Sequence, residues 1–180
     1  RLSRIGRVFQ NPAKGTCPTM TIMENMALAD NKGKPYNLGR CVNRKRREAY
    51  RELLRPLNLG LEDKLDVKVG ALSGGQRQAM ALLMSTMTPI EFLILDEHTA
   101  ALDPKTAEIN MELTEQIVSK KQLTSIMVTH NLRYALEYGN RIIMMHQGEI
   151  ILDKRGREKE ELEVEEVLEL FNEISIECGN

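Results

Sequence analysis

The sequence has no tryptophan, and aromatic residues make up only 4% of its 180 residues. Its three cysteines (Cys17, Cys41 and Cys178) lie far apart and form no CxxC pair. This arrangement argues against a disulfide framework or a zinc site and fits a reducing cytosol. No apolar run approaches the ~18 residues needed to cross a bilayer. No charged-then-apolar segment at the start indicates a secretion signal.

Net charge is also nearly absent, because 25 basic residues balance 26 acidic ones. The distribution is uneven: residues 1–60 carry 13 Lys and Arg against 4 Asp and Glu, and the remainder is acidic. The overall composition, 42% hydrophobic and 28% charged, is that of a globular protein. A basic first third fits a nucleic acid, a lipid surface, an acidic partner or a solvated helix, and composition does not choose among them.

Short apolar runs alternate with helical patterns in the second half of the chain. Residues 92–95 and 125–128 predict strands buried on both faces, as in a parallel sheet. Residues 105–120 between them predict a crossover helix whose apolar face holds Ile109, Leu113, Ile117 and Val118. The order strand, helix, strand predicts a βαβ unit.

The end of the chain predicts a hairpin followed by a helix. The hairpin spans residues 141–152 and turns at Gln147-Gly148. Residues 162–174 predict an amphipathic helix with an apolar face of Val164, Val167, Leu168 and Phe171.

The segment from about residue 19 to 88 is helical and loop-rich, with a break at residues 31–35. Within it, residues 76–87 predict a buried helix rich in Ala, Leu and Met. We therefore expect an α/β core with a helical insertion. The expected parts are a partial core (1–16 and 89–152), a helical subdomain (17–88) and an acidic amphipathic helix (153–180).

The most specific local pattern is the five-residue sequence Leu72-Ser73-Gly74-Gly75-Gln76, directly before the predicted buried helix. Ser73 is a good N-cap residue, and two glycines let a ligand approach the backbone closely. A helix N-terminus behind such a loop presents free N–H groups and a positive dipole end, which together favour an anion. A capped helix after a turn is the simpler interpretation of Ser-Gly-Gly alone.

A second pattern is the predicted strand at residues 92–95, which runs into Asp96-Glu97. Ligands of parallel sheets bind at the carboxyl ends of the strands, so these two acids are candidates for chemistry. The first can hold a phosphate-bound Mg²⁺ and the second can act as general base on a water. Two acids at a strand end are common on surfaces, and the pattern gains weight from following the glycine motif.

These motifs, in this order, resemble those of the ATP-binding subunit of an ABC transporter, from residue 8 to about residue 152. The matching segments are Val8–Pro12 (Q-loop), Leu72–Gln76 (signature), Phe92–Glu97 (Walker B strand with the catalytic glutamate), Ala100–Asp103 (D-loop) and Val128–His130 (switch histidine). The resemblance implies a P-loop NTPase (RecA-like) parallel-sheet core with an inserted α-helical subdomain. The stretch from Asp96 to Pro104 resembles bacterial uptake systems.

The resemblance also implies ATP and Mg²⁺ as cofactors and a role for each matching residue. Gln10 and Asp96 would bind Mg²⁺, and Gln10 would also report the nucleotide state to the permease. Glu97 would polarise the attacking water, and His130 would contact the γ-phosphate. In the signature, Ser73 and Gly75 would contact the γ-phosphate of the opposite subunit's ATP, with Gly74 and Gln76 also binding the cofactor, and Asp103 would lie at the dimer seam. His98, where the family usually has proline, and His146 have ordinary interpretations in a strand-exit turn and a hairpin turn.

One family motif is missing. No window of the sequence fits the phosphate-binding loop GxxxxGK[S/T], whose backbone amides and lysine hold the phosphates. The first residue is Arg1, and the family places that loop upstream of the Q-loop. We therefore expect a C-terminal part of a longer chain, without the N-terminal strands and the Walker A loop. Alone it should bind ATP poorly, hydrolyse none and aggregate through an uncovered sheet edge.

Two functions remain open at this stage. The first is a peripheral subunit at the cytoplasmic face of the cell membrane, paired with a second ATP-binding subunit, a permease and a periplasmic or extracellular solute-binding protein. The alternative is a soluble ABC-type ATPase acting on nucleic acid or ribosomes, suggested by the basic run 44–47.

The sequence favours the transporter, with no nucleic-acid partner. The interval from Gln10 to Ser73 is 63 positions without heptads, and a single signature is present. We expect the run 44–47 to be a solvated helix face, or to meet the permease or acidic lipid headgroups.

Overall fold

The computed structural model describes residues 4–34 and 41–177, so Pro35, at the end of the predicted break 31–35, and the third cysteine, Cys178, lie outside the described residues. The chain forms two compact units, Arg1–Val128 and Thr129–Asn180. No helix among the described residues is long and apolar enough to cross a membrane. The division of the chain expected from the sequence remains a prediction.

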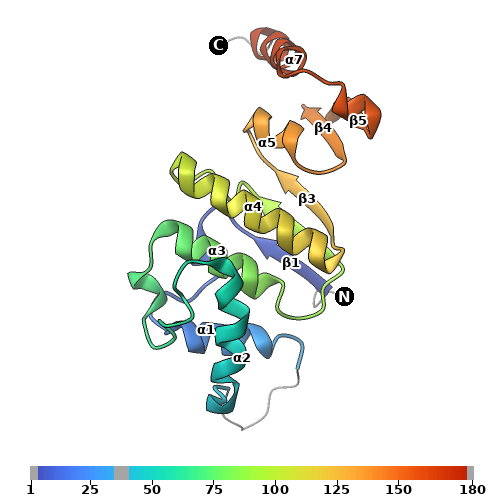
Figure 1. Cartoon of the computed structure of the whole chain (residues 1–180). Coiled ribbons are helices and arrows are strands. Elements are labelled where there is room, and N and C mark those ends of the chain that lie inside the picture. The colour runs from blue at the N-terminus through green and yellow to red at the C-terminus, as the bar shows by residue number, and fades with distance from the viewer. Residues whose placement is uncertain (1–3, 35–40, 178–180) are drawn as a thin grey trace. The chain divides into compact units, whose positions relative to one another are not determined.

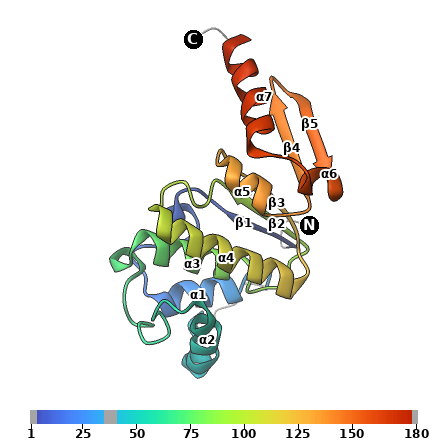
Figure 2. The same ribbon diagram turned by 45° about the horizontal axis from the view of Figure 1, so that its top comes forward.

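The first unit contains a parallel sheet of three strands in the order β1-β2-β3, labelled in Figure 2. The strands are β1 (Ile5–Val8), β2 (Phe92–Asp96) and β3 (Thr124–Val128). Helix α4 (Pro104–Lys121) connects β2 to β3, which confirms the predicted βαβ unit. Asp103 caps this helix and Pro104 occupies its first turn, where a missing N–H costs nothing.

The segment between β1 and β2 forms the predicted helical insertion. Its helices are α1 (Ile22–Asp30), α2 (Arg47–Leu54) and α3 (Gly74–Ser85), with 3₁₀ turns η2 (Pro12–Lys14), η3 (Arg44–Arg46), η4 (Arg55–Leu57) and η5 (Val69–Ala71). Helix α3 packs against α1, α4 and β1, so it is the central helix of this unit. Figures 1 and 2 both show α3 and α4 side by side next to the strands.

Only one face of the sheet is well covered. Val8, Leu93 and Leu95 alternate onto the face that joins the hydrophobic core with α3 and α4. On the other face Ile126 is 53% exposed and Val128 is 50% exposed. The prediction that both strands are buried on both faces is therefore wrong, because the helices of this unit pack against one side alone.

The apolar face predicted for α4 is correct for most of its members. Leu113 is buried in the core, and Ile117 and Val118 pack against it. Ile109, which was expected on the same face, is 41% exposed. The buried positions in its stretch of the helix are instead Ala107, Asn110 and Met111. The face is shifted because α3 approaches the start of α4 closely, as described below.

The second unit contains the predicted hairpin and helix. Its elements are α5 (Leu132–Glu137), β4 (Arg141–His146), β5 (Glu149–Arg155), α6 (Arg157–Glu160) and α7 (Val164–Glu177). Strands β4 and β5 are antiparallel, and the turn residues Gln147 and Gly148 both have positive φ, as a tight hairpin turn requires. Of the apolar face predicted for α7, only Val167 is buried, whereas Val164, Leu168 and Phe171 are exposed.

Candidate functional site

The N-terminus of α3 has the capped geometry that the glycine motif predicts. The Ser73 hydroxyl accepts from the backbone N–H of Gln76, and the Gln76 side chain accepts from the backbone N–H of Ser73, both at 3.2 Å. The Gln76 amide also donates to the carbonyl of Leu59 at 3.2 Å. The side chain of Gln76 thus holds the loop in place, and neither Gly74 nor Gly75 contributes its backbone N–H to this cap.

Gly75 has a packing reason to be glycine. It is buried, and a Cβ atom added to it would lie 2.1 Å from the Thr106 Cγ2 on α4 and 3.6 Å from the amide nitrogen of Asn110. No side chain other than hydrogen fits between the two helices there. The sequence suggested close approach of a ligand as the reason for this glycine, whereas the structure supplies a close approach of two helices.

The position of Thr106 is set by Asp103. The Asp103 carboxylate accepts from the Thr106 backbone N–H at 3.1 Å. Hydrogen bonds from the side chain and the backbone of Thr106 hold the pKa of Asp103 below its usual value. The residue expected at a dimer seam therefore also orders the contact that Gly75 makes.

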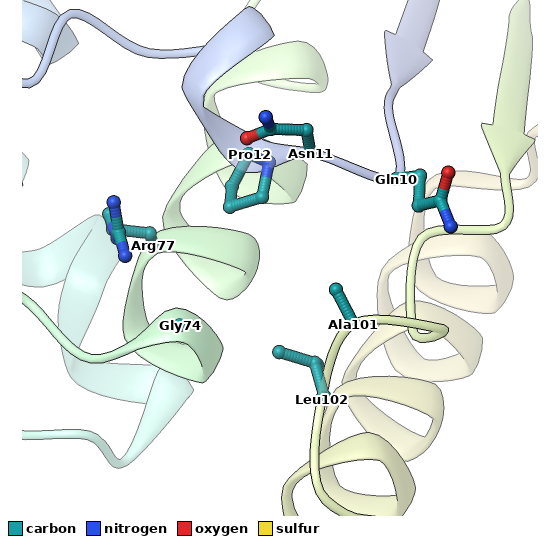
Figure 3. Close-up of a pocket in the computed structure, with 7 residues that line it drawn as sticks. All are labelled: Gln10, Asn11, Pro12, Gly74, Arg77, Ala101 and Leu102. Carbon is teal, nitrogen blue, oxygen red and sulfur yellow. The ribbon is translucent and has the colours of Figure 1, made fainter.

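A cavity of about 380 Å³ lies beside this contact (Figure 3). Three segments line it: the turn after β1, the first turns of α3 and the loop before α4. The lining residues are Gln10, Asn11, Pro12, Gly74, Arg77, Ala101 and Leu102. A Cβ atom added to Gly74 would lie 3.5 Å from the Leu102 side chain, so this loop closely adjoins the helix start. The structure thus brings the segments that resemble the Q-loop, signature and D-loop to one opening.

Asp96, which ends β2, has a basic partner. Oδ2 of Asp96 accepts from the Arg7 guanidinium at 2.7 Å. Arg7 also lies over the ring of Phe9, 4.6 Å from its centroid. The parallel register sets Arg7 opposite Ile94, on the face that Asp96 also occupies, which explains how they meet. Arg7 was not identified from the sequence, because an arginine in a strand carries no motif.

Glu97 turns the chain at the end of the strand. It has a φ of 44°, in the left-handed region that non-glycine residues rarely adopt. Its N–H donates to the carbonyl of Val128 at 2.9 Å, and its own carbonyl accepts from Ala100 at 3.0 Å. Such strained backbone tends to occur where a side chain must be aimed at a ligand.

The three histidines lie in different settings. His98 is buried, and its Nε2 lies 3.1 Å from the Thr114 hydroxyl on α4. Burial lowers the pKa of His98 to about 4, so the ring is neutral and packs in the interior. His146 ends strand β4 next to the hairpin turn. His130 belongs to the second unit, whereas the other predicted site residues belong to the first.

Comparisons with known proteins agree with this arrangement. The sequence model of the family described as "ABC transporter" matches residues 1–100. The chain is 53% identical over 171 residues to the "Tyrosine transport ATP-binding protein" of Clostridioides difficile (strain R20291). The chain belongs to the ABC transporter ATP-binding family. The alignment covers 95% of this chain and 68% of that relative.

Solved structures of the family share the fold. An ATP-binding cassette in its ADP conformation, MJ1267, has 25% identity and a TM-score of 0.74, and the match covers 98% of this chain and 69% of that one. A dimeric post-hydrolysis cassette bound to ADP and Pi, MJ0796, has 31% identity and a TM-score of 0.66, and the match covers 84% and 62% respectively. The predicted α/β P-loop NTPase fold is confirmed, and the predicted ABC ATPase family is correct.

The residues present suit Mg²⁺ in their chemistry. Asp96 offers a carboxylate and Gln10 an amide oxygen, the hard donors that Mg²⁺ prefers when phosphates complete its shell. Within residues 4–34 and 41–177 there is no group of three or more His, Cys, Asp or Glu placed to hold a metal by themselves.

Proposed function

We propose that these residues belong to the ATP-hydrolysing subunit of a transporter that takes up a solute. The observation that carries the proposal is the left-handed backbone of Glu97, directly after Asp96 at the carboxyl end of β2. It stands in the same compact unit as the capped glycine loop of α3. A strained acid at a sheet edge, with an anion-binding helix start in the same unit, supports phosphate chemistry.

Each side chain has a distinct part in the proposed reaction. Asp96 would exchange its Arg7 partner for Mg²⁺, and Gln10 would bind that ion or its water. Bound there, Mg²⁺ would supply positive charge that stabilises the phosphate groups. Glu97 would polarise the attacking water and take up its proton, while His130 would contact the γ-phosphate.

The glycine loop would serve a second subunit's nucleotide. Because the Gln76 side chain is occupied by Ser73 and Leu59, the loop would offer the Ser73 hydroxyl and the amides of Gly74 and Gly75. Asp103 would lie at the seam between the two subunits. A dimer is supported by the dimeric MJ0796 cassette, which shares 31% identity with this chain.

The proposed assembly also includes a permease and an external solute-binding protein. The name of the relative from Clostridioides difficile supports an amino acid as the solute and makes tyrosine the first to test. The subunit would lie on the cytoplasmic face of the membrane. The match covers 68% of the length of that relative, so the proposal is made for the full-length protein.

Action on nucleic acid has less support, because part of the basic run is used internally. Nε of Arg46 lies 2.9 Å from Oδ2 of Asp30. The Arg47 guanidinium binds Asp66 through two hydrogen bonds of 2.8 and 2.5 Å. These pairs favour a structural role for half of the run and weaken the hypothesis that all of it meets a permease or lipid.

The test uses the full-length protein reconstituted with its permease in liposomes. Glu97→Gln should retain ATP binding and lose hydrolysis by about 10²–10⁴-fold, since it removes the general base. Tyrosine uptake should fall with it. Glu115→Gln, which neutralises an exposed acid on α4, is the matched control and should hydrolyse ATP normally. Hydrolysis that survives Glu97→Gln would refute the proposal.

A further inference from the structure

The turn that carries Gln10 is tied to the helices at both of its ends by buried amide side chains. We call residues 9–17 the Gln10 loop. At its start, the Gln78 amide on α3 donates to the carbonyl of Phe9 at 3.1 Å. At its end, Asn25 on α1 accepts from the backbone N–H of Cys17 at 2.7 Å and donates to the Cys17 carbonyl at 3.0 Å.

The loop between these two attachments is ordered by its own hydrogen bonds. The Asn11 side chain accepts from the backbone N–H of Ala13 at 2.9 Å. The carbonyl of Pro12 accepts from the backbone N–H of Gly15 at 3.1 Å and from the Thr16 hydroxyl at 2.8 Å. These hydrogen bonds order the chain between its two attachments.

The burial of the Gln78 side chain lowers the stability of the fold. It is 1% exposed, and its Oε1 has no hydrogen-bond partner among the described residues. A buried polar atom without a partner costs stability, and an apolar side chain of similar length would avoid that cost. The amide is therefore best explained by what its donor does, which is to hold the carbonyl of the residue before Gln10.

The helix that holds Gln78 also carries the glycine loop. Gln78 follows Ser73 by five residues, about 7.5 Å along the axis at 1.5 Å per residue. Helices α1 and α3 pack together within one hydrophobic core, so both ends of the Gln10 loop are bonded to the same packed group of helices.

We propose that Gln78 and Asn25 are positioning residues that fasten the Gln10 loop to α3 and α1, so that Gln10 and the glycine loop move together. The proposal rests on the proposed function, in which Gln10 responds to the nucleotide of its own subunit and the glycine loop contacts that of the other. Through the two amides, nucleotide binding at one site would then change the position of the residues that contact the nucleotide of the other site.

The first arm of the test needs no nucleotide. Hydrogen exchange is measured on the nucleotide-free full-length protein, with Gln78→Met to remove the donor at similar length, and Asn25→Leu as the second variant. Losing a hydrogen bond of about 1 kcal/mol should speed amide exchange in residues 13–17 about fivefold. Met80→Leu, at another fully buried position of α3, is the control and should leave the loop unchanged.

The second arm measures ATP hydrolysis. Gln78→Met should lower kcat about tenfold and leave KM within twofold, because the loop still binds nucleotide but no longer moves with α3. If the wild type does not hydrolyse ATP, the proposed function fails, and the exchange arm still decides the attachment.

Three results would overturn the inference. The first is that amide exchange in the Gln10 loop is no faster in Gln78→Met and Asn25→Leu than in Met80→Leu. Another is acceleration spread evenly over residues 4–128, which would mean a loss of stability alone. The third is a faster loop with an unchanged kcat, which would remove the coupling between Gln10 and the glycine loop.

Discussion

Replacing Gly75 with alanine tests the close contact between α3 and α4 directly. The added methyl would lie 2.1 Å from Cγ2 of Thr106, whereas carbon atoms in contact normally lie about 3.5–4.0 Å apart. Thr106 cannot yield easily, because its hydrogen bonds to Asp103 hold the side chain. The two helices would have to separate by more than about 1 Å.

Two opposing effects set the magnitude. Overpacking of this kind destabilises the fold by about 1–3 kcal/mol, whereas replacing glycine by alanine within a helix stabilises it by about 0.5–1 kcal/mol. We expect Gly75→Ala to lower the free energy of unfolding by about 1–2 kcal/mol. Thr106→Ser removes the obstructing methyl, keeps the hydroxyl for Asp103 and should itself cost about 1 kcal/mol.

The assay is a double-mutant cycle by urea unfolding of the full-length protein. In the Thr106→Ser background, Gly75→Ala should be neutral or stabilising by up to about 1 kcal/mol, because only the helix propensity remains. The coupling energy between the two positions should thus be about 2 kcal/mol. If Gly75→Ala costs the same in both backgrounds, the contact with Thr106 is not the reason for the glycine.

Three further changes should have measurable effects. The pKa of His98 falls from 6.5 to about 4 on folding, so the unfolded state binds a proton at a higher pH than the folded state does. The free energy of unfolding should therefore drop by about 3 kcal/mol as the pH falls from 6.5 to 4. His98→Gln should remove most of this pH dependence, measured as the midpoint of urea unfolding at each pH. An equal slope in the variant would contradict the assignment. Tyr50→Phe removes the hydrogen bond that the buried Tyr50 hydroxyl donates to Asp30 at 3.0 Å and should cost about 1 kcal/mol in thermal or urea unfolding; a cost near zero would mean that the bond adds nothing. Ile126→Lys on the exposed face of β3 should reduce light scattering on heating without lowering stability by more than about 0.5 kcal/mol, and unchanged scattering would exclude this face as the route of aggregation.

Local patterns in the sequence were enough to predict most elements and much of the site. The Ser73 cap and its reciprocal bond to Gln76 depend on residues within one helical turn. The strand that ends in Asp96 and the hairpin around Gly148 are short-range patterns as well. Such features follow from neighbours in the chain, so composition and spacing are sufficient to recognise them.

The interactions that give the site its geometry come from residues far apart in the sequence. Arg7 reaches Asp96 across 89 positions, and Gln78 reaches Phe9 across 69. Neither belongs to a recognisable spacing, because the pairing depends on strand register and helix packing. The prediction that Ile109 lies on the buried face of α4 was wrong for the same reason, because the buried face depends on which helix packs there.

Sequence alone determined the family, the order of the motifs and the residue types that could bind phosphate and Mg²⁺. Tertiary structure decided that Gly75 is needed for helix packing, that β3 is covered on one face, and that Gln10 is tied to the helix of the glycine loop. The physical reason is that motifs record the chemistry of single side chains and their immediate neighbours. Burial and contact depend on which distant segments meet, which no local pattern specifies.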